Sequence, residues 1–169
     1  MVTINASTTS GLVMTSDLSG VLTFQQGGVS LPNGGVAPTF SAYQSSAQTL
    51  TSATVTKVQF QTEEWDTANA FDSTTNYRFT PTVAGYYQVN ANIQVGVSST
   101  IIYAYIYKNG SQFRQGQTAV NSVSSQVNSL VYLNGSTDYI EIYSQLTVGQ
   151  ALAAGAYATY FNACLVRGA

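Results

Sequence analysis

Histidine is absent from this sequence, and cysteine nearly so. None of the 169 residues is a histidine, and Cys164 is the single cysteine. Nucleophilic systems that need a histidine base are therefore excluded, together with most zinc sites. A lone cysteine cannot form an internal disulfide. Because Cys164 lies between apolar neighbours, we expect it at a buried strand position, with stability coming from packing and assembly.

Charge is the second scarce property. Only 7% of the residues are Asp, Glu, Lys or Arg, against about 25% in ordinary soluble domains. The five basic residues are scattered, and the formal net charge is -2, so we expect no nucleic-acid partner. A surface with few charges suits permanent assembly, because burying Thr or Tyr costs less than burying an unpaired Lys or Glu.

Long apolar runs are missing as well. The N-terminus has no basic start followed by an apolar stretch of signal-peptide length, and no later run approaches the ~18 apolar residues of a membrane span. We therefore expect synthesis in a cytoplasm, no export by that route and no membrane insertion.

What the sequence does contain is β-type patterning. Hydrophobic residues make up 44% and aromatic residues 12%, with 12 tyrosines. Apolar residues alternate with polar ones from Thr39 onward, most clearly through Tyr87, Val89, Ala91, Ile93 and Val95, which is the two-residue period of a strand. Further strands are expected around residues 55–60, 77–80, 101–108, 126–133, 139–143 and 157–166. No window shows a capped helical repeat, so we predict an all-β sandwich or barrel.

Turn signals separate these runs. Asn109-Gly110 is the strongest short-range hairpin signal in the sequence. Gly85, between Ala84 and Tyr86, is expected to serve a turn that needs a positive φ.

Residues 1–38 differ from the domain expected over residues 39–169. They hold short apolar pieces between glycine and asparagine turn signals. A segment of this size buries too little area to fold alone. It must therefore lie on a partner, which is two further copies of itself, a larger particle, or both. Pro32 and Pro38 mark the expected joint.

The order of motifs after Pro38 resembles the C1q/tumour-necrosis-factor jelly roll. The stretches that carry the resemblance are residues 37–42, 58–60, 71–72, 77–87 (YRFTPTVAGYY), 107–110 (YKNG), 130–142 and 157–166. This resemblance implies an antiparallel jelly-roll sandwich and a homotrimer, since C1q-like domains are characteristically trimeric. Residues 9–24 are similar to segments of bacteriophage tail-fibre and virion proteins. Together the two likenesses imply a structural protein of a phage rather than an enzyme.

Tyrosines are the candidates for the trimer interface. Tyr103, Tyr105 and Tyr107 alternate with Ile102, Ala104 and Ile106. Apolar or aromatic residues on both sides of one strand are hard to bury in a sandwich with one solvated face, and a subunit contact resolves this. The interface set predicted from the sequence is Tyr87, Tyr103, Tyr105, Tyr107 and Tyr160.

Two roles on a virion remain open. In the first, the protein is a capsid decoration (cement) protein on the capsid surface, made in the bacterial cytoplasm. Its N-terminal segment then binds the major capsid protein through Leu12, Val13, Val21, Leu22 and Phe24. In the second, it is a tail-fibre or head-fibre knob that binds a host-surface glycan or protein. We favour decoration because 169 residues leave no room for a fibre shaft.

Few residues carry chemistry. Glu63, Glu64 and Asp66 flank Trp65, the one tryptophan, and paired carboxylates beside an aromatic ring are one pattern of glycoside hydrolases. We expect instead a solvated loop, with Trp65 in the core, no catalysis and no cofactor. The remaining alternatives are calcium bound by Asp66, Asp72 and Asp138, and sugar binding, for which Trp65 would be the stacking residue.

Overall fold

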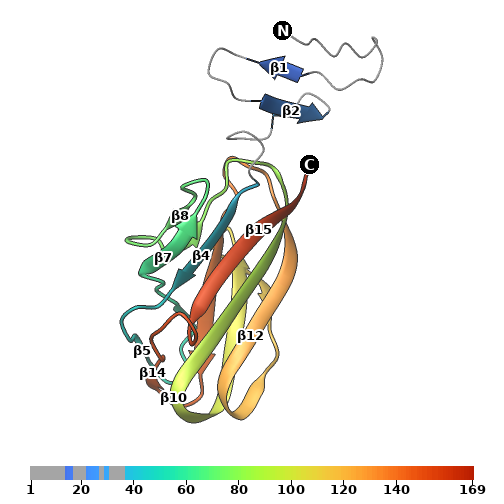
Figure 1. The fold of residues 1–169 in the computed structure, drawn as a ribbon. Coiled ribbons are helices and arrows are strands. Elements are labelled where there is room, and N and C mark those ends of the chain that lie inside the picture. Colours follow the sequence, from blue (N-terminus) through green and yellow to red (C-terminus); the bar gives the residue numbers. More distant parts are fainter. Residues whose placement is uncertain (1–13, 17–21, 27–28, 31–36) are drawn as a thin grey trace. The chain divides into compact units, whose positions relative to one another are not determined.

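The computed structural model describes residues 14–16, 22–26, 29–30 and 37–169. The chain divides into two compact units, Met1–Ala37 and Pro38–Ala169, one residue before the boundary expected from the sequence. In the first unit, β1 (Met14–Ser16), β2 (Leu22–Gln26) and β3 (Val29–Ser30) form an antiparallel sheet in the order β1-β2-β3 (Figure 1).

The second unit is entirely β, as the alternation predicts. Its strands are β4 (Thr39–Tyr43), β5 (Thr49–Leu50), β6 (Thr56–Lys57), β7 (Thr62–Asp66), β8 (Phe71–Asp72), β9 (Arg78–Phe79), β10 (Gly85–Lys108), β11 (Ser111–Gln115), β12 (Ala119–Leu133), β13 (Ile140–Leu146), β14 (Gln150–Ala151) and β15 (Tyr160–Gly168). Every pairing between them is antiparallel. The described residues include no helix that could span a bilayer.

Strand β10 connects the two layers of this unit. Its first part pairs with β15 on one side and β12 on the other, and β15 continues to β4 and β7. Its last part pairs with β13 and β11, and β13 also pairs with β6 and β9. The first layer therefore has β7 at one edge and β12 at the other, as Figure 1 shows. We refer to this layer, β7-β4-β15-β10-β12, as the amide sheet.

The core lies between the two layers and follows the two-residue period of β10. Tyr87, Val89 and Ile93 are fully buried from its first part, and Ile102 and Ile106 from its last. Aromatic rings fill the centre around one phenylalanine: the Phe40 ring lies 4.8 Å from Phe71, 4.5 Å from Phe79 and 4.8 Å from Phe161, measured between centroids. Such ring pairs add about 0.5–1.5 kcal/mol each beyond the area they bury.

The hairpin predicted at Asn109-Gly110 is present between β10 and β11. The φ angles of Asn109 and Gly110 are 52° and 77°, as a two-residue loop with both φ values positive requires. The expectation for Gly85 is wrong in its reason: this residue begins β10 without a positive φ. A Cβ there would meet the Arg167 carbonyl oxygen at 2.4 Å, so close strand packing requires glycine.

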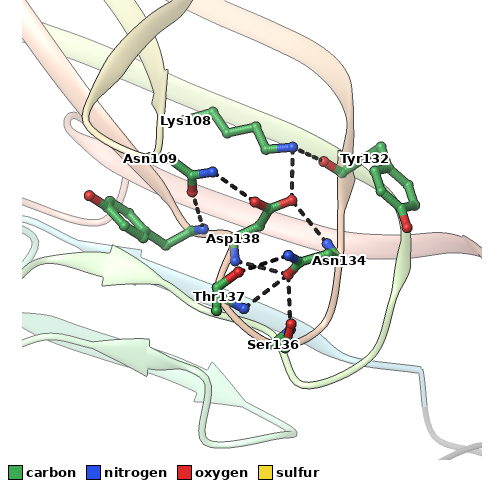
Figure 2. Close-up of polar contacts among 8 residues, drawn as sticks. Lys108, Asn109, Tyr132, Asn134, Ser136, Thr137 and Asp138 are labelled. Atoms are coloured by element: carbon green, nitrogen blue, oxygen red, sulfur yellow. Dashed lines mark hydrogen bonds and ion pairs between the residues drawn. The ribbon is translucent and has the colours of Figure 1, made fainter.

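A polar network joins this hairpin to the turn between β12 and β13 (Figure 2). The Asp138 carboxylate accepts hydrogen bonds from Asn109 Nδ2 at 2.7 Å and Asn134 N at 3.1 Å, and it pairs with Lys108 Nζ at 2.9 Å. Asn109 Oδ1 accepts a hydrogen bond from Tyr139 N. The Lys108-Asn109-Gly110 hairpin and the turn from Asn134 to Asp138 are therefore tied together, which is a structural role for both motifs.

Asp138 is expected to stabilise the fold only when ionised. The Lys108 ammonium and the Asn109 amide lower the pKa of Asp138 below its usual value, so its contribution is present above the unfolded-state pKa and is lost as the pH falls below it. Asp138→Asn should lower the free energy of unfolding by about 1.5–3 kcal/mol at pH 7, as for hydrogen bonds to charged groups.

The measurement is urea unfolding of both proteins from pH 7 down to pH 3. The difference between them should shrink below about pH 4, where the unfolded-state carboxyl binds a proton. Thr137→Ala, which removes a neutral hydroxyl from the same turn, serves as the control and should give a difference that is independent of pH. A pH-independent deficit in Asp138→Asn would contradict the assignment.

Candidate self-association surface

The outward face of the amide sheet is wide and, apart from Glu64 on β7 and Arg167 near the end of β15, uncharged. Its side chains come from β4, β15, β10 and β12, and register aligns them in rows across the strands. The rows are Tyr43, Tyr160, Asn92 and Gln126; Ser41, Asn162, Asn90 and Asn128; and Thr39, Cys164, Gln88 and Leu130. None of these residues is charged, although a solvated sheet face in an ordinary soluble protein carries Lys and Glu.

Carboxamides dominate the middle of this face. Asn90 donates to Asn162 Oδ1 at 3.1 Å and accepts from Gln88 Nε2 at 3.2 Å. A shallow depression of about 270 Å³ lies beside them, and Gln126, Asn128 and Tyr160 contribute to its lining. Side-chain amides both donate and accept, so such a face can bond to another polar surface without paired charges.

One end of the face is apolar. The rings of Tyr86 and Tyr132 lie 5.4 Å apart between centroids. Leu130 is 51% exposed and Val166 is 61% exposed. Cys164 is exposed on the same face, so the expectation that it is buried is wrong. The core position belongs to its neighbour Ala163, which pairs with Val89.

The edge of the sheet at β12 is also uncharged. Ala119–Leu133 contains no Lys, Arg, Asp, Glu or Pro. Among the described residues β12 pairs only with β10. Protein edge strands that stay in water are usually protected by charges, prolines or bulges. A long edge that carries neither charge nor proline is suited to being covered.

The opposite edge, β7, differs from the sequence-based expectation. Residues Glu63 to Asp66 form part of a strand rather than a loop, and Trp65 is 50% exposed rather than buried. Ser41 pairs with Trp65 while Ala42 pairs with Glu63, so Glu64 is the extra residue of a β-bulge. Its carboxylate accepts a hydrogen bond from Ser41 Oγ at 2.7 Å, which places Glu64 beside Trp65 on the outward face.

The outward face of the other layer carries a row of tyrosines. The ring of Tyr105 lies 6.1 Å from that of Tyr103 and 6.4 Å from that of Tyr107, and Tyr107 stacks on Tyr143 at 4.1 Å. Burial, followed by the neighbouring hydroxyls of Tyr103 and Tyr107, raises the pKa of Tyr105. Tyr105 stacks on Tyr103 and meets Tyr107 edge to face, so the rings pack as one aromatic layer over the sheet.

The structure therefore divides the tyrosines predicted for the interface. Tyr160 lies on the amide face, whereas Tyr103, Tyr105 and Tyr107 lie on the other layer. Tyr87 is corrected: it is fully buried in the core, donates to Val83 O at 2.7 Å, and burial raises its pKa to about 12. It cannot contact a partner subunit.

The predicted partner contacts fall in the first unit. Leu12, Val13 and Val21 lie outside the described residues. Leu22 and Phe24 belong to β2, where they pair with Ser16 and Met14.

The three aspartates considered for calcium are each used within the fold. Asp66 accepts hydrogen bonds from the backbone amides of Ala68, Ala70 and Phe71. Asp72 accepts backbone amides from the 74–76 turn, which hold its pKa well below its usual value. Among the described residues, no three His, Cys, Asp or Glu side chains gather as metal ligands would.

The amide face was visible in the sequence only as polar positions that alternate with core residues. Gln88, Asn90 and Asn92 occupy these positions in the 86–95 run. A strand face that stays in water usually carries Lys or Glu at these positions. The amides found there instead are the sequence feature that indicates a covered surface.

Comparison with known proteins gives the fold. No protein-family model and no curated protein matches the sequence. Among solved structures, murine APRIL at pH 8.0 matches with a TM-score of 0.62 and 10% identity, over 78% of this chain and 100% of that one.

Two further structures give the same result. The globular domain of zebrafish complement 1qA matches at 0.60 and 15% identity, over 79% of this chain and 100% of that one. Eiger TNF from S. frugiperda matches at 0.60 and 12% identity, over 79% of this chain and 94% of that one. The domain that follows Ala37 therefore has the TNF/C1q-like jelly-roll fold that its motifs resemble.

Proposed function

We propose that this chain is a non-enzymatic structural protein of a bacteriophage virion, which acts as a homotrimer and decorates the capsid surface. The observation that carries the self-association is the uncharged amide face together with the uncharged β12 edge. Burying the uncharged rows of this face and the β12 edge in a permanent contact involves no desolvation of unpaired charge. The resemblance to C1q-like domains, which are characteristically trimeric, supports three copies.

The attachment to a particle is assigned to the first unit. Its three short strands offer little area for an independent core, and the apolar residues Leu12, Val13, Val21, Leu22 and Phe24 supply contacts for the major capsid protein. Three copies in one trimer would bind together, so weak single contacts combine into tight attachment. The protein would be made in the bacterial cytoplasm and act on the capsid surface, without catalysis and without a bound cofactor.

The second candidate is a fibre knob that binds a host-surface glycan. The half-exposed Trp65 favours it, because an exposed aromatic ring can stack on a sugar. Purified residues 38–169 would then block adsorption of the phage to host cells. Under the decoration proposal residues 38–169 would leave adsorption unchanged, because they bind nothing on the cell.

Cys164 provides a direct test of the buried face. In the full-length protein, which we expect to sediment as a trimer, its thiol should react with Ellman's reagent at least about tenfold more slowly than an exposed thiol. The matched control combines Cys164→Ser with Gln59→Cys, which moves the thiol to an exposed position of the second layer. Equal rates for the two proteins in the trimer would exclude the amide face from the contact.

Removal of residues 1–37 tests the attachment. The truncated protein should keep Pro38, whose carbonyl accepts a hydrogen bond from Leu165 N, and should remain a soluble trimer. It should lose binding to capsids in a co-sedimentation assay, because the apolar contacts of the first unit are gone. Capsid binding equal to that of the full-length protein would refute this role for the segment.

A further inference from the structure

Most charges of the second unit are neutralised within it. Lys57 pairs with Glu141 at 2.5 Å, and Lys108 pairs with Asp138 at 2.9 Å. The carboxylates of Asp66 and Asp72 are held by the amides of their own loops. These groups have no need of an external partner.

The acidic residues that remain are both on the edge strand β7. Glu63 and Glu64 are exposed, and each carboxylate accepts one hydrogen bond from a serine hydroxyl, of Ser73 and Ser41 respectively. Neither forms an ion pair with any described residue. The bulge at Glu64 places its carboxylate next to the half-exposed ring of Trp65.

An arginine remains at the other edge of the unit. Arg114 is exposed on β11, with its guanidinium carbon 4.2 Å from the centroid of the Phe113 ring. It has no carboxylate partner within the described part of the chain. Strand β11 pairs with the last part of β10, and β12 pairs with the first part on the same side, so Arg114 and the uncharged β12 share the margin away from β7.

The two margins are therefore complementary in charge. A contact that joined like margins would bring the Glu63 and Glu64 pairs of two copies together, and like charges that face each other across an interface oppose association. A head-to-tail contact joins unlike margins, and repeating it generates a ring where the rotation between copies closes, as it does in a trimer. The distribution of charge favours this second arrangement.

We propose that the margin of β11 and β12 of one copy docks on the β7–β4 margin of the next, with the Arg114 guanidinium on the Trp65 ring and the Glu64 carboxylate. A planar guanidinium stacks on an indole face and donates to a carboxylate at once. The uncharged β12 then lies against the uncharged amide face. This contact rests on the self-association proposed above and specifies which surfaces form it.

Charge reversal tests the pairing. Arg114→Glu and Glu64→Arg should each raise the concentration at which the trimer half-dissociates by roughly 30-fold or more, as for truncation of a buried charge pair. The double variant should recover most of the loss, because the pair is restored with exchanged signs. Analytical ultracentrifugation over a dilution series gives the midpoints, and circular dichroism checks that every variant is folded.

Two further variants complete the set. Gln59→Glu, at an exposed position whose neighbour Val58 bonds to β13 of the second layer, should leave the midpoint unchanged. Arg167→Glu reverses the other exposed arginine, which lies on β15 opposite Tyr86 of β10 rather than at either margin. It should weaken the trimer less than Arg114→Glu. Trp65, as the sole tryptophan, should be less accessible to acrylamide in the trimer than in the dissociated wild type.

The outcomes separate this contact from the proposed function. A wild-type protein that stays monomeric overturns both. Three results with a stable wild-type trimer overturn the edge contact and leave self-association standing. They are reversals that do not weaken assembly, a double variant that does not recover the wild-type midpoint, and Trp65 fluorescence that acrylamide quenches as fully in the trimer as in the dissociated protein.

Discussion

The two-residue period of one strand, β10, determines most of this molecule. Because β10 runs through both layers, its inward residues Tyr87, Val89 and Ile93 and later Ile102 and Ile106 supply core to each layer in turn. Its outward residues are fixed by the same pleat, amides in the first part and tyrosines in the last. A single register shift along β10 would exchange core for surface in both layers, so the core and the candidate interface depend on one alignment.

Scarcity of charge makes the placement of each charge informative. The two ion pairs and two loop carboxylates hold loops in place rather than providing chemistry, and the half-buried Arg78 lies over the Tyr139 ring. At the two opposite margins the unpaired groups are Glu63 and Glu64 on β7 and Arg114 on β11. Between them the outward face carries amides, hydroxyls, tyrosines and apolar groups, with Arg167 near one end as its one exposed charge among the described residues. In the proposed contact between copies, the charged groups set the orientation of the two surfaces, and the uncharged area provides most of the contact.

The sequence predicted the strands well where polar and apolar residues alternate, as in residues 86–95, and it predicted the hairpin at Asn109-Gly110 because few dipeptides adopt two positive φ angles. It failed where both alternate positions are apolar. In residues 163–166 nothing local distinguishes inward from outward, and Cys164 was assigned to the wrong side. Trp65 was misplaced because a bulge at Glu64 and an edge position are tertiary features. The prediction for Tyr87 failed because no sequence pattern shows that its hydroxyl has an acceptor inside the fold. In the structure that acceptor is Val83 O.

An uncharged edge strand is a hazard to a protein that remains a monomer. β12 presents Val120, Val123, Leu130 and Tyr132 to solvent along a strand without a single charge, and such edges pair with other chains. Closed assembly removes that hazard, because a ring of head-to-tail contacts covers each copy's β12 with the next copy's sheet and leaves no open end. In the proposed assembly the trimer therefore precedes any role on a particle: once β12 is covered, the first unit of each copy acts as one arm of the proposed trivalent attachment.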